Sequence, residues 1–508
     1  MTMTSAMPKR LRVAAVVLNS VSHDIRVCKE ADGLGHAGFD VTIVGVRDRR
    51  ESSPRSLRGP NVRIVRVDIP NWAAYRKYLG ESRRSMLTAC VTLLLILLIL
   101  GSPFGSMIDL LLANLSATFG IAGLVALPIL CYLAFRFARR ARRFGRLATN
   151  KRMEFASSAP ASPPSTGWWP AVKASIVDTL RGVRWICIWI RRLGRFRSCI
   201  EAELDRISPQ FVHCHDLPAL PVVIRWCRRN PGVRLVFDSH ELYEEVSGLT
   251  PLTRWCCRRI LRRHAGRVDG FITVNDSIAR EHAARYPALP PAVVVRNATR
   301  VPENPIVYDG RLHRAAGVDL DRRVLLYQGG FSKERGLESL VAAAGGLPAD
   351  WVLVMMGWGP LEPRLRSMVE RDPGIPERVR FVPPAPQEEL VAWTAGGDFG
   401  VIPYENTCLN HWYCSPNKLW EYPAAGVPIL ATPFPEMRRV IEDHGIGRTL
   451  PEGFKGPDLA GLLESIVPAE RRRMIESCRA FIEADHWEIY QTRLDRLYAE
   501  LREDVRPD

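Results

Sequence analysis

Short apolar runs alternate with polar helical segments over the first part of the chain. The runs at 11–18, 41–46 and 62–67 are the length of buried strands, and segment 24–38 between the first two has helical spacing. Because these runs are apolar throughout, both of their faces should be covered. The pattern predicts a parallel β-sheet between layers of helices, which is an α/β fold.

Two long uncharged stretches, 86–100 and 110–135, then interrupt this pattern. The second is long enough to cross a bilayer as a helix. The first would measure about 22 Å, short of a hydrocarbon core of about 30 Å unless it continues into the next residues. Arg83 and Arg84 precede the first stretch, and the basic run 136–152 follows the second. The positive-inside rule therefore predicts a two-pass membrane hairpin with cytoplasmic flanks, and a buried helical hairpin is the alternative.

The chain after the hairpin returns to strand-like runs. A Pro/Ala/Ser-rich linker, 155–170, leads into the basic segment 172–200, which carries tryptophans and an apolar stripe. That segment is either an interfacial helix or an amphipathic helix packed on the sheet. Strand-like runs follow in two series, at 211–216, 235–240, 271–274 and 293–297, and then at 324–330, 352–359, 379–383, 399–404 and 427–433.

Two series of strands predict two doubly wound domains. The C-terminal stretch 470–505 has helical spacing. The predicted divisions are 1–80 and 201–300 for the first domain, 81–200 for the inserted hairpin, linker and amphipathic helix, 301–480 for the second domain, and 481–508 for a helix that packs back toward the first domain.

Charge and cysteine content narrow the choice of partners. The 508 residues carry a net charge of +16, most of it from arginine. Such a balance favours an anionic partner, and the basic run beside the hairpin favours membrane phosphates over nucleic acid, for which no motif is present. None of the 12 cysteines forms a C-x-x-C pair, as expected of reduced thiols in the cytosol. The apolar run near the N-terminus has the length of a strand and lacks a cleavage site.

Candidate binding residues follow the strands of the second series. Ligands of such sheets bind at the carboxyl ends of the strands. Glycines there allow close backbone approach, and a helix start with nearby cations suits a diphosphate. A carboxylate on a helix beside them could bind a ribose diol. The residues concerned are Gly329, Gly330, Lys333, Arg335, Gly357, Gly359, Asn417, Lys418 and Glu421.

Several of these segments resemble the retaining glycosyltransferases of family 4. The resemblance rests on 417–437 (NKLWEYPAAGVPILATPFPEM), YQGGFSKERGLESL, the GWGP turn and the N-terminal SHDIRVCKEADGLGHAGFDVTIVG. It covers about 11–67 and 209–450, most of the chain outside the insertion. It implies a GT-B fold of two Rossmann-like domains, with the acceptor on the first and the nucleotide sugar on the second.

The resemblance also implies roles for individual residues on the donor side. Glu421 is similar to the last glutamate of the family's E-x7-E pattern, but the first glutamate falls at Tyr413, so Glu405 is a second candidate. Arg335 matches the phosphate-binding basic residue. The companion arginine falls at Gly330, a departure that Lys418 could offset.

On the acceptor side, His215 matches the histidine near the reacting sugar, which makes it the candidate catalytic residue. The other expected acceptor-side residues are His23, Asp24, Arg26 and His240. His213 is interpreted as structural. His213 and His215 could form part of a metal site, but no third ligand has fitting spacing. Asp319 and Asp321 precede a strand and are interpreted as a solvated turn, so no metal site is predicted.

The resulting prediction is a metal-independent hexosyltransferase of the bacterial inner membrane, with cytoplasmic catalytic domains. It would move sugar from a nucleotide-diphosphate sugar to a lipid-linked or other membrane acceptor in cell-envelope or exopolysaccharide synthesis. No cofactor is expected, and the expected partners are the nucleotide sugar, the acceptor and anionic lipids, not nucleic acid. The alternatives are a non-catalytic GT-B membrane scaffold and a nucleotide-sugar epimerase.

Overall fold

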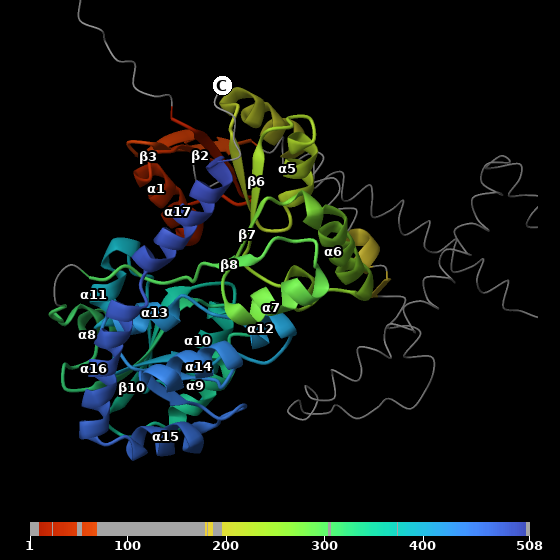
Figure 1. Cartoon of the computed structure of the whole chain (residues 1–508). Coiled ribbons are helices and arrows are strands. Elements are labelled where there is room, and N and C mark those ends of the chain that lie inside the picture. The colour runs from red at the N-terminus through yellow and green to blue at the C-terminus, as the bar shows by residue number, and fades with distance from the viewer. Residues whose placement is uncertain are drawn as a thin grey trace, which may run out of the picture. The chain divides into compact units, whose positions relative to one another are not determined.

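A computed structural model describes residues 10–22, 24–47, 53–68, 178–179, 181–185, 196–302, 306–372 and 374–503. The chain divides into two compact units, Met1–Asp68 with Thr166–Asp508, and Ile69–Ser165. The second unit contains the predicted hairpin and lies outside the described residues. The helices and strands of the first unit form two parallel-sheet domains (Figure 1).

The first sheet has eight strands in the order β3-β4-β2-β1-β5-β6-β7-β8. All neighbouring strands are parallel except β3, which pairs antiparallel with β4. The antiparallel edge strand β3 was not predicted, because its residues are mostly exposed and lack an apolar run. The strands are β1 (Arg12–Val16), β2 (Asp40–Val46), β3 (Arg55–Gly59), β4 (Val62–Val67), β5 (Phe211–His215), β6 (Arg234–Ser239), β7 (Gly270–Thr273) and β8 (Ala292–Val294).

Helices connect these strands as in a doubly wound fold. Helix α1 begins after Asp24, whose carboxylate accepts a hydrogen bond from the backbone N–H of Val27 and so caps the first turn. The predicted strand–helix–strand order at the N-terminus is therefore correct. The helices are α1 (Ile25–His36), α5 (Leu220–Cys227), η1 (Tyr243–Glu245), α6 (Pro251–His264), η2 (Ala265–Arg267) and α7 (Asp276–Arg285).

The second sheet has six strands, all parallel, in the order β11-β10-β9-β12-β13-β14. Strands β10 and β12 are buried along almost their whole length, and β9 is buried from Val324 to Gln328, which agrees with their apolar runs. The strands are β9 (Arg323–Gly330), β10 (Trp351–Trp358), β11 (Val379–Val382), β12 (Phe399–Ile402), β13 (Ile429–Ala431) and β14 (Gly447–Thr449).

Helices of the second half cover this sheet and return to the first one. The helices are α8 (Arg311–Ala316), α9 (Leu337–Ala343), η3 (Ala344–Gly346), α10 (Glu362–Arg371), η4 (Gln387–Glu389), α11 (Leu390–Thr394), α12 (Leu409–Trp412), α13 (Lys418–Ala424), α14 (Pro435–His444), α15 (Gly456–Ser465), α16 (Pro468–Ala484) and α17 (Trp487–Glu503). The predicted helical stretch at the C-terminus is two helices. The second, α17, packs on α1 and β8 (Figure 1). Its Tyr498 contacts the rings of Phe39 and Phe211.

Candidate functional site

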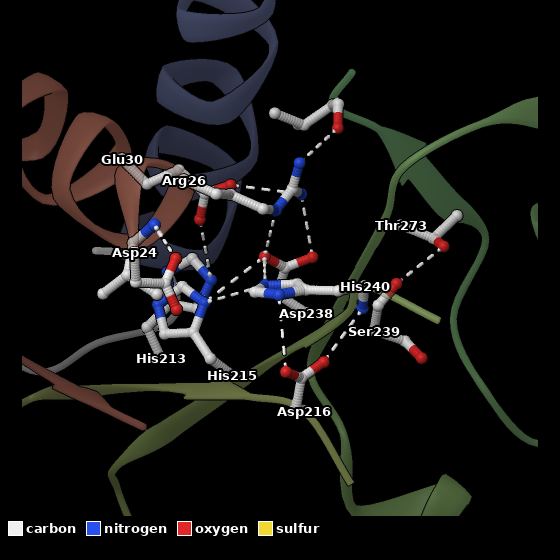
Figure 2. Close-up of polar contacts among 12 residues, drawn as sticks. Asp24, Arg26, Glu30, His213, His215, Asp216, Asp238, Ser239, His240 and Thr273 are labelled. Carbon is white, nitrogen blue, oxygen red and sulfur yellow. Dashed lines mark hydrogen bonds and ion pairs between the residues drawn. The ribbon is translucent and has the colours of Figure 1, made fainter. Parts of the chain in front are cut away.

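The carboxyl ends of β5 and β6 bring together a cluster of buried charged residues. These two strands are neighbours in the first sheet, and α1 lies beside them. His215 ends β5, and Asp238 and His240 lie at and just beyond the end of β6, with Arg26 and Glu30 on the first turns of α1 (Figure 2). Segments more than 180 residues apart in sequence thus form one site.

Asp238 is the centre of this cluster. Its side chain is fully buried and accepts hydrogen bonds from Arg26 Nε at 2.8 Å and Nη2 at 2.9 Å. Oδ2, the oxygen that accepts from Arg26 Nε, also lies 2.9 Å from Nε2 of His240. Burial alone would raise the pKa of Asp238, but Arg26 and His240 outweigh it and hold the pKa well below its usual range. The carboxylate is therefore charged at neutral pH.

His240 bridges two carboxylates. Its Nδ1 lies 3.4 Å from Asp216, and its Nε2 contacts Asp238. Burial would lower its pKa, but the carboxylates of Asp216 and Asp238 raise the pKa to about 10. His240 is consequently a half-buried cation, and its ring borders the cavity described below.

The two histidines of β5 are buried, and His215 lies next to His240. His215 is 1% exposed, with Nδ1 at 3.3 Å from His240 Nε2 and 3.3 Å from Asp238. His213 stacks on His215 with ring centroids 4.3 Å apart, and its Nδ1 is 3.0 Å from the hydroxyl of Tyr498 on α17. Burial and the neighbouring His215 lower the pKa of His213 well below its usual value. The interpretation of His213 as structural stays a prediction.

Glu30, His213, His215 and Asp238 also form a possible metal-ligand set, because one ligand atom of each lies within 4.8 Å of the others. The two carboxylates, Glu30 and Asp238, lie on α1 and β6, so sequence spacing did not identify them as possible partners of the histidines. However, Arg26 binds both oxygens of Asp238 and lies 3.1 Å from Glu30. The two histidine rings are also stacked, at an angle of 11°, so their planes do not meet near the cluster and one ion cannot lie in both. A cation would have to displace the guanidinium, and the residues as arranged do not fit one.

A cavity of about 350 Å³ opens beside this cluster. Arg26 and His240 form part of its wall, whereas His215 does not. Asp24, a predicted acceptor-side residue, borders it as well and accepts a hydrogen bond from Asn19 at 2.7 Å. The remaining polar lining residues are Ser20, Asn297 and Asn417, the last from the start of α13. The predicted residue His23 lies outside the described residues.

The predicted donor-side cations meet at one point of the second sheet. Arg335 donates a hydrogen bond to the hydroxyl of Tyr404, and its guanidinium lies 4.4 Å from the centre of that ring. Nζ of the buried Lys418 is 3.4 Å from the same hydroxyl and 5.3 Å from the ring of Tyr327. Neither cation makes an ion pair with any acidic residue in the described part of the chain. Two converging cations without a carboxylate partner are suited to an anion.

Lys418 also lies against the glycine turn that ends β9. A Cβ on Gly329, whose φ is +118°, would lie 2.9 Å from Lys418 Nζ, whereas Gly330 faces open space. Lys333, a few residues further on, is exposed. Thus Lys418 occupies the neighbourhood of the position where the resemblance expects a second basic residue.

The other predicted donor-side residues differ in their surroundings. Glu421 on α13 is half-buried and accepts a hydrogen bond from Nε2 of Gln328 at 2.9 Å. Tyr413 instead packs against Leu242, and its carbonyl accepts a hydrogen bond from Asn275 at 2.7 Å, both of them residues of the first sheet's loops. Glu405 is exposed, just after β12, and its pKa is raised by burial and by neighbouring carboxylates.

Gly357 and Gly359 meet protein backbone, not open space. A Cβ on Gly357 would lie 2.0 Å from the carbonyl oxygen of Gly329, and one on Gly359 would lie 2.3 Å from that of Phe331. Close approach of the β9 turn therefore explains these glycines without a ligand. Asp319 and Asp321 are both exposed ahead of β9.

Two glycosyltransferase family models match this chain. Residues 322–466 match "Glycosyl transferases group 1", and residues 155–300 match "Glycosyltransferase Family 4". The chain carries glycosyltransferase domains of group 1 and family 4. The two matches lie on the second and the first sheet respectively.

Curated relatives are transferases of modest similarity. The alpha-D-kanosaminyltransferase of Streptomyces kanamyceticus is 26% identical over 57% of this chain and 75% of its own length. A D-inositol 3-phosphate glycosyltransferase of Streptosporangium roseum is 30% identical over 35% of this chain and 42% of its own length. The chain thus spans less than half the length of the second relative.

Solved structures show the same fold. Sucrose-phosphate synthase from Thermosynechococcus elongatus gives a TM-score of 0.63 at 14% identity, covering 97% of this chain and 100% of that one. WaaG, a glycosyltransferase involved in lipopolysaccharide biosynthesis, gives 0.53 at 11% identity, covering 96% and 99%. Anabaena HepE in complex with UDP-glucose gives 0.50 at 13% identity, covering 60% and 82%. The fold is the predicted α/β, GT-B-like pair of parallel-sheet domains.

The predicted membrane hairpin, 86–135, lies outside the described residues. Within the described part of the chain, no helix has the length and apolar character needed to cross a bilayer.

Proposed function

We propose that this protein is a retaining glycosyltransferase that moves a sugar from a nucleotide-diphosphate sugar to a lipid-linked acceptor at the bacterial inner membrane. The observation that carries the proposal is the convergence of Arg335 and Lys418 on Tyr404 beside the glycine end of β9. Cleavage of the sugar–phosphate bond leaves negative charge on the diphosphate, and fixed cations in a partly buried site stabilise it. This arrangement makes a divalent cation unnecessary for that purpose.

Contacts from α13 would complete the binding site for the donor. Glu421, held by Gln328, is placed three residues after Lys418 and would accept hydrogen bonds from the ribose hydroxyls. The similarly folded HepE was solved with UDP-glucose, which supports a nucleotide sugar as the donor class.

The acceptor would enter the polar cavity of the first sheet. Asp24, Asn297 and Asn417 offer hydrogen-bonding groups suited to a hydroxyl-bearing acceptor. In the reaction that the resemblance implies, the acceptor oxygen bonds to the anomeric carbon on the face from which the diphosphate leaves. The departing phosphate oxygen takes the hydroxyl proton, so retention needs no protein nucleophile.

The membrane part of the proposal rests on sequence. The uncharged stretches 86–100 and 110–135, flanked by arginines, favour a hairpin with the catalytic domains in the cytoplasm. A lipid-linked acceptor for cell-envelope or exopolysaccharide synthesis is the class that a membrane-attached transferase would use.

A non-catalytic scaffold is the second candidate. It is favoured by Tyr413, which occupies the position of the family's first glutamate and packs on the other domain. An epimerase would share the donor site but would need no acceptor. Hydrolysis or transfer from a panel of nucleotide sugars separates an enzyme from a scaffold.

Calorimetric titration with nucleoside diphosphates tests the donor site. Arg335→Ala and Lys418→Ala should each weaken binding by about 1.5–3 kcal/mol, the scale of a charge-assisted hydrogen bond. Arg472→Ala is the control, because Arg472 is exposed on α16. Unchanged affinity in both site variants would remove these residues from a diphosphate site and refute the proposal.

His215 and His240 test the acceptor side. His215→Ala should lower turnover by roughly 10²-fold, the cost of losing a positioned group, with little change in donor affinity. His215 contacts His240 and does not line the cavity, so its loss would lower turnover by changing the position of the His240 ring. The alternative role, support of the fold, predicts a lower Tm with near-normal turnover. Turnover, Tm and donor affinity measured on His215→Ala and His240→Ala decide between the two.

A further inference from the structure

Five exposed arginines gather around the C-terminal part of α6, on the first sheet. They are Arg228, Arg259, Arg262, Arg263 and Arg267, named here the α6 arginine patch. None of them makes an ion pair with an acidic side chain in the ranges that the structure describes. Other arginines nearby are neutralised, since Arg229 pairs with Glu201 at 2.9 Å. The patch is therefore a local excess of positive charge.

The positive charge of the α6 arginine patch contributes to the low pKa of the neighbouring His264. The pKa of this half-buried histidine is lowered to about 4, first by burial and then by repulsion from Arg228, Arg263 and Arg267. Arginines that repel one another and make no ion pair add nothing to folding stability. Their concentration on one face is better explained by an anionic partner.

The helix itself has two distinct faces. Thr253, Cys257 and Leu261 are buried at four-residue spacing. Trp255, Arg259, Arg262 and Arg263 lie on the opposite face at spacings of four, three and one residues. Trp255 is 45% exposed, and the guanidinium of Arg259 lies 5.5 Å from the centre of its ring. A half-exposed tryptophan among arginines is typical of a helix at a membrane surface.

The start of α6, at the other end of the helix from the patch, lies against a part of the chain that follows the apolar stretches in sequence. The short helical segment 181–185 packs on the start of α6, where a Cβ on Gly182 would lie 2.5 Å from Oγ1 of Thr250 and 3.2 Å from Cβ of Leu252. A single exposed tryptophan supplies no set of stacking aromatics, so nucleic acid is disfavoured.

We propose that the α6 arginine patch, with Trp255, docks on the headgroups of an anionic phospholipid bilayer and orients the first sheet's cavity relative to that surface. The proposal rests on the membrane attachment proposed above and is independent of nucleotide-sugar chemistry. The interaction is electrostatic and requires anionic lipid, unlike an apolar insertion.

Chemical footprinting of arginine tests this on the full chain. The chain is reconstituted in nanodiscs of phosphatidylcholine, with or without about one third phosphatidylglycerol, and treated with phenylglyoxal. Modification is then measured by peptide mass spectrometry. Arg259, Arg262 and Arg263 should react at least about fivefold more slowly in the anionic nanodiscs, on the scale of one basic residue's attraction to an anionic surface. Arg472 and Arg473, exposed on α16, are internal controls and should react equally in both.

Variants with reversed charge provide a second test of the proposal. The triple variant Arg259→Glu, Arg262→Glu and Arg263→Glu should lose the protection of Arg228 and Arg267 in anionic nanodiscs, while Arg472→Glu with Arg473→Glu keeps it. Nucleoside diphosphate binding should be the same in both variants, so a failed donor site is recognised separately.

Equal reactivity of the patch in the two lipid compositions would overturn the proposal. Protection by duplex DNA but not by anionic lipid would assign the patch to nucleic acid instead. Protection that depends on protein concentration and not on lipid would assign it to a second copy of the chain.

Discussion

Neutralising Asp238 should destabilise the first sheet's domain more than any surface charge change. Asp238→Asn keeps the shape of the side chain but removes the charge that Arg26 binds through two hydrogen bonds. Loss of one partner from a buried ion pair costs about 3–5 kcal/mol, because the other charge stays buried. Glu30 remains 3.1 Å from Arg26 as partial compensation, although burial raises its pKa to about 7, so we expect the lower end of this range.

Urea unfolding followed by circular dichroism measures this cost. Asp40→Asn is the matched control, since Asp40 also binds an arginine through two hydrogen bonds, 2.7 and 2.8 Å to Arg63. That pair is largely exposed, with 52% of the Arg63 side chain accessible, and should contribute less than about 1 kcal/mol. Equal losses of unfolding free energy in the two variants would refute the reasoning that burial makes the Asp238 charge essential.

The pH dependence of stability gives an independent check on the same variant. The folded-state pKa of His240, about 10, exceeds its ordinary value of 6.5. Its contribution to stability is therefore complete below about pH 6.5 and is lost as the pH rises through about 10. Asp238→Asn removes one of the two carboxylates that raise the pKa of His240, so this loss of stability should be smaller and should be complete at a lower pH. If the unfolding free energy of the variant and of the parent depended on pH in the same way, Asp238 would not be what raises the pKa of His240.

Three further predictions concern other elements. Gly336→Ala should lower the free energy of unfolding by more than about 1 kcal/mol, because φ is +67° and a Cβ would lie 1.8 Å from the carbonyl oxygen of Pro403; Gly330→Ala, with open space, should leave the Tm nearly unchanged. Tyr498→Phe should cost about 1–3 kcal/mol in urea unfolding by leaving His213 Nδ1 without its partner, and an unaltered midpoint would argue against that bond. Cysteines placed at 84 and 138 should resist an impermeant thiol reagent in intact cells, and labelling of either from outside would exclude the hairpin.

The local pattern of apolar and polar residues was sufficient to predict most strands of the two sheets. Strands such as β1, β2, β9 and β10 are buried on both faces, so their sequences are continuous apolar runs that stand out against polar helices. The edge strands β3 and β14 escaped prediction because each is short and carries exposed polar residues.

The donor side was also accessible from sequence. Gly329, Arg335, Lys418 and Glu421 lie in loops at the ends of strands, and parallel strands deliver their loops to one sheet edge. What the sequence could not decide was which cations meet. Only the packing of α13 under β9 brings Lys418 against Gly329 and beside Tyr404.

The acceptor side depended most on tertiary structure. The sequence shows His213, His215 and His240 as polar residues within or just after strands. It does not distinguish Glu30 and Asp238 from the other residues of a helix and an apolar strand. Each of the two has a partner more than 180 residues away in sequence. Burial raises the pKa of Glu30, whereas Arg26 and His240 outweigh burial and lower the pKa of Asp238. Sequence therefore determined which residue types the strand ends present. The adjacency of β5, β6 and α1 decided which charges neutralise one another, since Coulomb interactions depend on distance in space and on exclusion of water.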